Sequence, residues 1–384
     1  MKHLLCILLA AILALPAGAR GGIKDLIENV KKEYAPDSRQ AVFEVRASKA
    51  KDGIVVVRGK ISDPEAKKAL HDRLMLSAIA NVDSTVLLPQ DQWAQPRISV
   101  ACVRTKPGHA SEMATQAIMG MPLRVLENDG DWWRVQTPDG YIGYVVDNSL
   151  AEKTADEMMA WRKAPRLVVT ATYQTRAYAS PTATGMREVV TDLVNGNIVE
   201  GTLSTPVNGR VEITLPDGRK GWADIAGLTE ISEWAAQDFN PDVILDIAYS
   251  MEGTPYLWGG TSIKSLDCSG LAKVSYLANG IILMRDASQQ AKTGRRIEAK
   301  DWRTCQAGDL LFFGNAKTGR VTHVAIYDHD GNYVHSSGRV KRNSVDPESP
   351  SYLTTPFLHA TRIAGSEGTQ GITLVRNHPW YFNQ

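Results

Sequence analysis

A repeated β-turn pattern constrains the middle of this chain more than any other feature. The segment WWRVQTPDGYIGYV covers residues 132–145, and RVEITLPDGRKGWA covers residues 210–223. Both alternate like strands, turn at Pro-Asp-Gly and continue with a glycine followed by an aromatic residue. The turn glycine supplies the positive φ that a tight hairpin needs. The repeat predicts two small β-barrels in tandem, at 97–150 and 166–229. A purely structural role without a ligand is the alternative for both.

The rest of the chain divides into segments of other kinds. With 384 residues, the chain is too long for one ordinary domain of about 150 residues. Residues 24–95 show helix and strand patterns in the order α-β-β-α-β, which predicts a small α+β domain. A polar helical link at 152–165 separates the two barrels, and an amphipathic helix leads into a last domain over residues 240–384. The predicted fold class is therefore multidomain α+β.

The first residues have the character of an export signal. Lys2 gives a positive start, an apolar run covers residues 4–15, and small residues at 17–19 supply a cleavage site after Ala19. We expect a signal peptide over residues 1–19, export to a periplasm or to the extracellular space, and no membrane attachment after cleavage. A retained membrane anchor is the alternative, which the short run disfavours. Lys plus Arg number 43 against 42 for Asp plus Glu, so the charge gives no case for nucleic-acid binding.

Cleavage leaves three cysteines, Cys102, Cys268 and Cys305, and an odd number argues against a disulfide framework. Cys268 lies in the sequence DCSG, between a turn-rich loop and a helical apolar pattern, which predicts it at the first turn of a helix. The positive end of that helix would stabilise a thiolate, and the backbone N–H of Cys268 could donate to an oxyanion. Cys102 and Cys305 lack such surroundings and are predicted in the core. A buried, inert Cys268 is the alternative.

A nucleophilic cysteine needs a base, and two histidines further along offer one. His323 opens a strand-like run and His335 lies on the next, with a turn at residues 328–332 between them, so the two can be neighbours across a hairpin. One imidazole would then take the thiol proton while the other orients it. Cys268, His323 and His335 could instead bind zinc, but they lack close-spaced ligand pairs. We therefore predict nucleophilic catalysis without a metal or organic cofactor.

The last domain carries several motifs in a fixed order. They are PYLWGG (255–260), DCSG (267–270), RDASQQ (285–290), AGDLLFF (307–313) and THVAIY (322–327), followed by His335. With these motifs, the domain resembles the NlpC/P60 family of papain-like cell-wall peptidases. The resemblance implies a papain-like α+β fold for residues 240–384 and a triad of Cys268, His323 and His335. The two β units resemble bacterial SH3 domains, and residues 24–95 resemble a BON-type domain in their element order.

Paired SH3-like barrels before such a domain resemble the γ-D-glutamyl-L-diamino acid endopeptidases. This resemblance implies a murein peptide substrate, L-Ala-γ-D-Glu-diamino acid, and a first barrel that closes one end of the cleft. Acidic and tyrosine groups would hold the free amine of L-Ala, and we expect Asp267, Glu112 and Tyr141 in that role. The other expected substrate contacts are Tyr256 and Trp258 as cleft walls, and Ser269, Asp286 and Ser288 toward the substrate backbone or carboxylate.

Alternatives stay open for two of these residues and for the whole protein. Asp267 could cap the helix that follows it, which does not exclude amine binding. Glu112 could be a plain exposed acid in a loop. The protein could be an autolysin that acts on intact peptidoglycan, or a wall-binding protein with a vestigial hydrolase domain. We expect a monomer.

Overall fold

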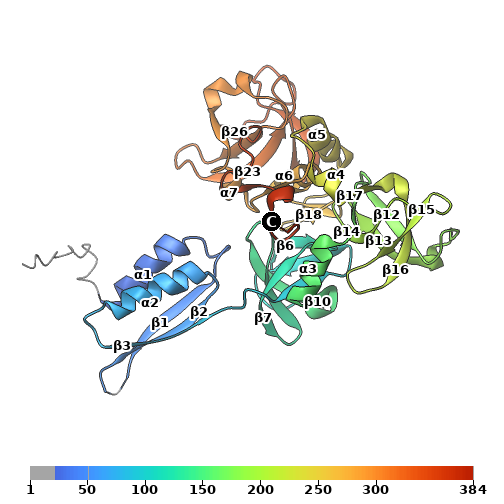
Figure 1. Cartoon of the computed structure of the whole chain (residues 1–384). Helices are drawn as coiled ribbons and strands as arrows, with labels where there is room; N and C mark the ends of the chain where they lie inside the picture. Colours follow the sequence, from blue (N-terminus) through green and yellow to red (C-terminus); the bar gives the residue numbers. More distant parts are fainter. Residues whose placement is uncertain (1–21, 51, 384) are drawn as a thin grey trace, which may run out of the picture. The chain divides into compact units, whose positions relative to one another are not determined.

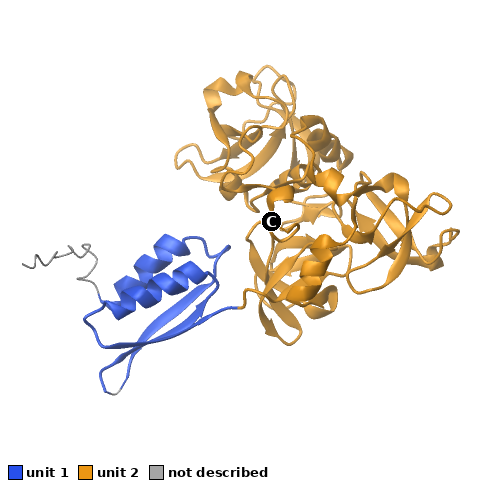
Figure 2. Ribbon diagram, viewed as in Figure 1, with its two compact units in different colours: residues 1–88 blue, residues 89–384 orange. Residues whose placement is uncertain are grey.

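The computed structural model describes residues 22–50 and 52–383, so the predicted signal peptide over residues 1–19 lies outside the described residues. The chain forms two compact units, residues 1–88 and residues 89–384 (Figure 2). Helices accompany several separate sheets, which confirms the multidomain α+β fold class (Figure 1). In the described part of the chain, no helix is long and apolar enough to cross a membrane.

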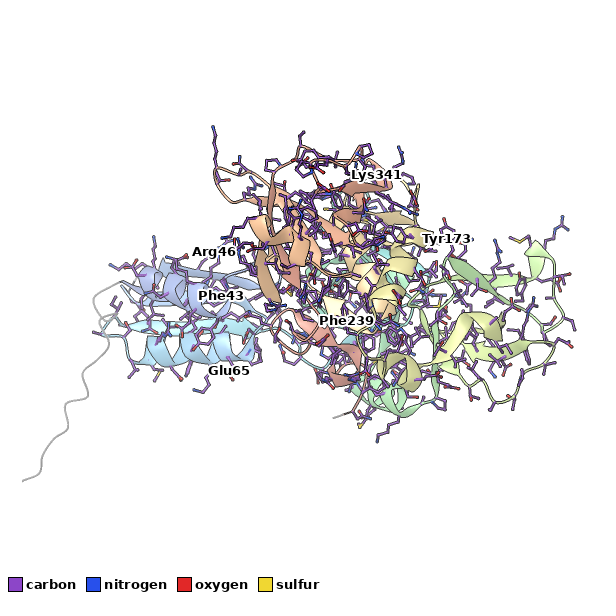
Figure 3. The ribbon with its side chains drawn as sticks, turned by 90° about the horizontal axis from the view of Figure 1, so that it is seen from above. Phe43, Arg46, Glu65, Tyr173, Phe239 and Lys341 are labelled. Atoms are coloured by element: carbon purple, nitrogen blue, oxygen red, sulfur yellow. The ribbon has the colours of Figure 1, made fainter. Side chains whose placement is uncertain are left out.

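The first unit is a three-stranded sheet with two helices, in the predicted element order. Strand β1 pairs antiparallel with β2, and β3 pairs parallel with β2. Asp63 caps the second helix by accepting from the backbone N–H of Glu65. Phe43, labelled in Figure 3, is buried in the core that the sheet shares with the helices. The elements are α1 (Ile23–Tyr34), β1 (Phe43–Lys49), β2 (Val55–Ile61), α2 (Pro64–Met75) and β3 (Asn81–Leu87).

The second unit begins with a seven-stranded sheet in the order β10-β4-β7-β8-β9-β5-β6. Its first strand precedes residue 97, where the sequence placed the start of the first barrel. The predicted Pro-Asp-Gly turn joins β8 to β9, with Gly140 at φ +84°. The strands are β4 (Trp93–Pro96), β5 (Val100–Arg104), β6 (Met113–Ile118), β7 (Leu123–Asp129), β8 (Trp132–Gln136), β9 (Ile142–Val146) and β10 (Leu150–Lys153).

A second seven-stranded sheet follows after helix α3 (Ala155–Lys163), in the order β13-β12-β16-β15-β14-β11-β17. The second Pro-Asp-Gly turn joins β15 to β16, with Gly218 at φ +83°. Among the described strands, neither seven-stranded sheet closes into a complete hydrogen-bonded ring, so the predicted barrels are open sheets. The strands are β11 (Arg166–Val169), β12 (Gln174–Tyr178), β13 (Val189–Val194), β14 (Ile198–Gly201), β15 (Arg210–Thr214), β16 (Lys220–Asp224) and β17 (Leu228–Glu230).

The last part of the chain packs helices against a six-stranded sheet in the order β21-β26-β22-β23-β24-β25. Its core joins apolar residues of α5 and α6 to residues of β22, β23 and β24. Phe239, just before α5 and labelled in Figure 3, packs against this core and lies 6.3 Å from the ring of Tyr276. The helices are α4 (Ile231–Ala235), α5 (Pro241–Ser250), α6 (Cys268–Ala278) and α7 (Ala287–Gln290).

Two small sheets accompany the six-stranded one, β18 with β19 and β20 with β27. The strands of this part are β18 (Thr261–Ser262), β19 (Ser265–Leu266), β20 (Ile281–Leu283), β21 (Arg295–Glu298), β22 (Leu310–Gly314), β23 (Val321–Tyr327), β24 (Asn332–Ser337), β25 (Arg339–Ser344), β26 (Phe357–Arg362) and β27 (Ile372–Leu374). Short 3-10 turns occur at η2 (Asp147–Ser149), η3 (Met186–Glu188), η4 (Ile225–Gly227), η5 (Ala299–Thr304) and η6 (Val375–Asn377).

One apolar core ties the parts of the second unit together. It contains Trp93 of β4, Trp161 of α3, Val168 of β11, Trp234 of α4 and Tyr381 near the C-terminus, all buried. These residues come from both β units, the linking helix and the last domain. Because their burial depends on all four parts, the junctions between them are packed like a domain interior.

The placement of Cys102 differs from the prediction. The sequence placed it in the core, yet its side chain is exposed. Strand β5 alternates, and the neighbours Ala101 and Val103 take the buried face, which turns Cys102 to solvent. Cys305 is buried, as predicted.

Candidate active site

Cys268 lies at the N-terminus of α6. Asp267 is the N-cap of this helix and accepts a hydrogen bond of 2.7 Å from the backbone N–H of Gly270. Glycine is needed at position 270 because a Cβ there would overlap the carbonyl oxygen of Gly260 in the preceding loop. Leu271 and other apolar residues of α6 enter the core, so the helix start and the half-buried Cys268 are held against the sheet.

Asp267 is paired with Arg285, which the sequence reasoning did not select. Arg285 donates to both carboxylate oxygens, at 3.1 and 2.5 Å, and both side chains are almost fully buried. Arg285 also donates to the Ser269 hydroxyl at 2.9 Å and to the carbonyl of Ala114 in β6 at 3.1 Å. Its position in the RDASQQ motif was a signal that could have drawn attention to it.

The environment of Asp267 bears on its expected role as the amine-binding acid. Its oxygens also accept from the N–H of Gly259 and from the hydroxyl of Ser269. With the Gly270 cap and Arg285, the carboxylate is fully coordinated and its charge is neutralised inside the protein. The structure therefore shows Asp267 as the N-cap of α6 and as the partner of Arg285. Capping does not exclude amine binding, so the role of Asp267 toward the substrate amine stays a prediction.

Strands β23 and β24 bring the two predicted histidines into contact. His323 Nε2 lies 2.7 Å from His335 Nδ1, and His335 Nε2 lies 2.9 Å from Oδ1 of Asn343 on β25. Asn343 was not selected from the sequence. Its amide nitrogen donates to the carbonyl of Ser351, which leaves its oxygen facing His335. His335 therefore donates from Nε2 and accepts at Nδ1 from His323, so Nδ1 is the unprotonated nitrogen of a neutral His323.

The Cys268 thiol lies beside the strand that carries His323, because α6 packs against β23. Burial, followed by the charge of Asp267, raises the pKa of the Cys268 thiol to about 11, although the backbone N–H groups of Val324 and Ser269 act in the opposite direction. Val324 directly follows His323, so the sulphur lies beside the histidine strand. The N–H of Ser269 at the start of α6 favours the thiolate, as the sequence predicts, whereas burial favours the neutral thiol.

Both histidines are neutral at pH 7. Burial, reinforced by His335 and Lys341, lowers the pKa of His323 to about 3, and burial lowers the pKa of His335 to about 4. The resting site thus holds a neutral thiol and a neutral imidazole. Charge separation is favourable only when the thiolate and the imidazolium form together and compensate each other.

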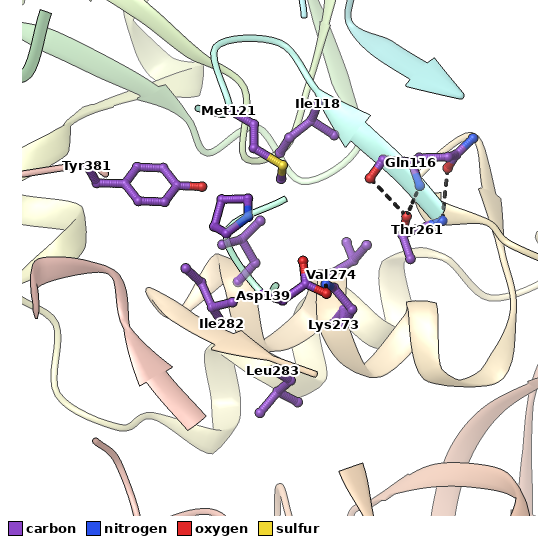
Figure 4. A pocket seen from close by; sticks show the side chains of 12 residues that line it. Gln116, Ile118, Met121, Asp139, Thr261, Lys273, Val274, Ile282, Leu283 and Tyr381 are labelled. Atoms are coloured by element: carbon purple, nitrogen blue, oxygen red, sulfur yellow. Dashed lines mark hydrogen bonds and ion pairs between the residues drawn. The ribbon is translucent and has the colours of Figure 1, made fainter. Parts of the chain in front are cut away.

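The first β unit packs against the loop that precedes Cys268. A Cβ at Gly259, which has φ +82°, would overlap the carbonyl oxygen of Met113 in β6. The N–H of Gln116 donates to Thr261 Oγ1 at 2.8 Å, and the N–H of Thr261 donates to Gln116 Oε1 at 2.9 Å (Figure 4). The PYLWGG loop is therefore held in place by β6 as well as by its own domain.

Tyr141 and Asp286, predicted independently from distant parts of the sequence, form a direct contact. The Tyr141 hydroxyl donates to Asp286 Oδ2 at 3.2 Å, just past the Pro-Asp-Gly turn. Asp286 also caps α7. Glu112 is exposed and directly precedes Met113, whose carbonyl approaches Gly259. Tyr141 and Glu112 of the first β unit thus lie on segments that contact the last domain.

The remaining predicted residues differ in exposure. Burial, followed by the charges of Cys268 and Asp267, raises the pKa of Tyr256 to about 12, so its hydroxyl stays protonated within electrostatic range of the thiol. Trp258 is 62% exposed, and Ser288 in α7 is half-buried. The buried Ser269 directs its hydroxyl to Asp267 and Arg285 rather than to open space.

The geometry of the site also bears on the alternative that Cys268, His323 and His335 bind zinc. Within residues 22–50 and 52–383, no group of three or more His, Cys, Asp or Glu side chains is arranged to hold a metal ion. Facing nitrogens of His323 and His335 bond to each other, so a metal would have to replace that hydrogen bond.

Known proteins share parts of this sequence. Residues 253–362 match the NlpC/P60 family, and residues 103–150 match the bacterial dipeptidyl-peptidase Sh3 domain. Dipeptidyl-peptidase 6 of Lysinibacillus sphaericus is 30% identical over 265 residues, which cover 66% of this chain and 92% of that protein. The gamma-D-glutamyl-L-lysine dipeptidyl-peptidase of Bacillus cereus is 28% identical over 288 residues, which cover 69% of this chain and 80% of that protein.

A solved structure shares the fold. The crystal structure of an NlpC/P60 family protein from Bacillus cereus aligns with a TM-score of 0.60 and 21% identity, and covers 71% of this chain and 99% of that one. The fold, the family match and the relatives together define a cysteine peptidase with SH3-type β units. The chain belongs to the NlpC/P60 family.

Proposed function

We propose that this protein is an exported cysteine peptidase that cleaves the γ-D-Glu–diamino acid bond of murein peptides with a free N-terminal L-Ala. One observation carries the chemistry: Cys268 at the start of α6 adjoins the strand whose His323 is hydrogen-bonded to His335, which in turn is bonded to Asn343. These hydrogen bonds leave the Nδ1 nitrogen of the His323 imidazole unprotonated. The substrate class is supported by relatives such as the one named for γ-D-glutamyl-L-lysine.

The reaction begins with proton transfer. In this proposal His323 Nδ1 takes the thiol proton as the Cys268 sulphur attacks the γ-carbonyl carbon of D-Glu. The backbone N–H of Cys268 donates to the developing oxyanion. His335 accepts from His323 Nε2, and Asn343 accepts from His335, so the new imidazolium keeps its orientation.

Collapse of the tetrahedral intermediate breaks the C–N bond. The imidazolium of His323 protonates the leaving α-amine of the diamino acid, and the acyl group stays on Cys268 as a thioester. His323 then removes a proton from water, which attacks the thioester carbon. The second tetrahedral intermediate collapses by breaking the C–S bond, and the proton returns from His323 to the sulphur. The γ-carboxyl group of D-Glu leaves as the acid and gives its proton to the solvent.

The amine end of the substrate is proposed to bind Asp286 and Tyr141, with Glu112 as a further acid. An ammonium in a confined cleft needs a carboxylate to offset its lost hydration. Asp286 suits this role because it is only half-buried, whereas Asp267 is neutralised by Arg285. Tyr256 and Trp258 would line the cleft, and Ser288 would contact the substrate near Asp286.

The test is a cleavage assay on L-Ala-γ-D-Glu-diaminopimelate and its L-lysine counterpart, each free and N-acetylated. Cys268→Ala serves as the control that removes the nucleophile. Cleavage of the free peptides alone, lost in the control, is the expected result. The relative rates of the two free peptides then define the preferred diamino acid.

Other outcomes lead to the alternatives. Equal cleavage of free and acetylated peptides would contradict the amine site and favour an autolysin that acts on intact wall. Absence of cleavage in all four peptides, with retained binding to peptidoglycan, would favour a wall-binding protein.

A further inference from the structure

A buried ion pair docks the first Pro-Asp-Gly turn on the catalytic helix. Lys273 Nζ lies 2.6 Å from Asp139 Oδ2, and the two side chains are only 16% and 4% exposed. Lys273 belongs to α6, the helix that begins at Cys268, whereas Asp139 is the middle residue of the turn between β8 and β9. Figure 4 shows the two side chains close together. The helix that carries the nucleophile thus also carries the anchor of the first β unit.

The turn transmits this anchoring to Tyr141. The Thr137 hydroxyl donates to Asp139 Oδ1 at 2.7 Å, and the backbone N–H of Thr137 donates to the carbonyl of Tyr141 at 2.9 Å. On the other side, His378 Nε2 lies 3.0 Å from the carbonyl oxygen of Pro138. Because Asp139 and Tyr141 are both bonded to Thr137, a displacement of the carboxylate displaces the tyrosine.

From Tyr141 the contacts return to the nucleophile. Its hydroxyl donates to Asp286, and the preceding residue Arg285 donates to Asp267, which caps α6 directly before Cys268. The contacts therefore form a closed circuit that leaves α6 at Lys273 and re-enters it at its N-cap. Such a circuit fixes the distance between the tyrosine and the thiol on both sides.

The surroundings of the pair favour a geometric role over simple stabilisation. Lys273 and Asp139 line a cavity of about 40 Å³ together with apolar residues such as Val274, Ile282 and Leu283 (Figure 4). Burial lowers the pKa of Lys273, and the Asp139 carboxylate opposes that shift. Well-packed apolar residues could dock the turn without this desolvation cost. An ion pair adds a requirement that apolar contacts lack, because Nζ and the carboxylate must meet at hydrogen-bond distance.

We propose that Lys273 is a positioning residue for substrate recognition, which holds Asp139 and thereby sets Tyr141 against Asp286 at the site for the substrate's free amine. This inference deepens the proposed function and rests on it. Lys273 contacts neither the reacting atoms nor the substrate, so its effect is on binding of the amine end.

The test compares Lys273→Met with the matched variant Asp217→Asn in the turn of the second repeat. Lys273→Met is expected to raise KM for free L-Ala-γ-D-Glu-diaminopimelate about ten-fold while kcat changes less than about three-fold. Lys273→Arg keeps the charge and should recover most of the loss. The double variant Lys273→Met/Asp139→Asn removes both charges of the pair together, and it should still show the raised KM.

A double-mutant cycle separates positioning from general damage. If Lys273 acts through Tyr141, then Lys273→Met should add little to the KM effect of Tyr141→Phe, whereas independent roles would give additive effects. Hydrogen exchange of amides 137–145 supplies a readout independent of activity. It should quicken in Lys273→Met and in the double variant, and stay unchanged in Asp217→Asn.

The outcomes distinguish the two proposals. Unchanged exchange at residues 137–145, or additive KM effects in the cycle, would overturn the role of Lys273 while leaving the peptidase activity intact. A wild-type protein that ignores N-acetylation would contradict the amine site itself and with it the recognition role of Lys273. Exchange would then report only on docking of the turn.

Discussion

The Pro-Asp-Gly turn at residues 138–140 and the one at 216–218 have the same backbone conformation, with their glycines at φ +84° and +83°. Each is closed by a hydrogen bond from the glycine N–H to the carbonyl three residues earlier, at 2.8 and 2.9 Å. Their aspartates have different partners. Asp139 pairs with Lys273 of the catalytic helix, whereas Asp217 pairs with Arg219, directly after its own turn, and with Arg97 of the first β unit.

The residue after each turn extends this contrast. Tyr141 reaches Asp286 in the last domain, whereas Arg219 donates to the Asp217 carboxylate and to the carbonyl of Arg97. One copy of the repeat therefore contacts the proposed cleft, and the other joins the two β units. Local sequence fixes the shape of a turn, but its place in the tertiary structure decides what that turn can serve.

The largest expected effect on stability comes from adding a side-chain methyl group at two glycines that lie against the backbone of another segment. Gly259→Ala would overlap the carbonyl of Met113, and Gly120→Ala would overlap the carbonyl of Ile198 in the second β unit. At positive φ with a backbone clash, each should destabilise the fold by roughly 2–4 kcal/mol. Thermal unfolding would measure this loss.

Activity should separate these two variants. Gly259→Ala shifts the loop that carries Tyr256. At temperatures where this variant is still folded, its kcat/KM should therefore be about 100-fold lower than that of the wild type. Gly120→Ala should keep most of its activity there, since it disturbs the contact between the β units. Equal losses of activity in both would contradict the assignment of the first β unit to the cleft.

Acid should destabilise the catalytic domain more than the β units. The unfolded chain protonates histidine near pH 6.5, whereas the pKa values of His323 and His335 in the native protein are about 3 and about 4. Between these values the unfolded state binds more protons, so this stability is complete above pH 6.5 and is lost as the pH falls toward 4. From pH 6.5 to pH 5 the pair should lose about 3 kcal/mol.

Urea unfolding at pH 7 and pH 5 measures that slope. The double variant His323→Gln/His335→Gln should reduce this pH dependence of the free energy of unfolding. Part of it will remain, because burial also lowers the pKa values of His359 and His378. The β units from residue 93 to residue 230 contain one histidine, His109. An unchanged slope in the double variant would place the acid sensitivity outside the candidate active site.

The residues that follow the two turns offer a smaller and more specific contrast. Tyr141→Phe removes one hydroxyl at the proposed amine site and should raise KM for the free peptide about ten-fold, or about 1.4 kcal/mol. Arg219→Gln, at the equivalent position, should leave kcat and KM unchanged. Steady-state kinetics on the free peptide tests both, and an equal effect of the two would remove the distinction between the repeats.

The smallest effect is expected at the second turn. Asp217→Asn weakens an ion pair whose arginines Arg97 and Arg219 are 41% and 39% exposed. Solvent screens such a pair, so the stability loss should stay below about 1 kcal/mol. Asp139→Asn should cost more, because it leaves Lys273 buried without its carboxylate. Chemical denaturation of the two variants side by side would measure this ranking.

The sequence identified the residues whose types are typical of nucleophilic catalysis, but not the residues that hydrogen-bond to them. Cys268, His323 and His335 were selected because a thiol at a helix start and two histidines across a turn form a recognisable pattern, and their catalytic roles stay predictions. Arg285 and Asn343 were missed, since each matters through a partner set by strand register or by a long-range contact. The error at Cys102 has a similar cause, because the phase of β5 decides which residue faces the core.

The sequence by itself determined the local features: the α-β-β-α-β order of the first unit, both Pro-Asp-Gly turns and the helix that begins at Cys268. These depend on backbone preferences and patterns within a few residues. Only the tertiary structure decided that Asp139 meets Lys273 whereas Asp217 does not, and that Asp267 is neutralised by Arg285 while Asp286 faces Tyr141. Such pairings depend on how distant segments pack, and two copies of one short motif carry no information about that.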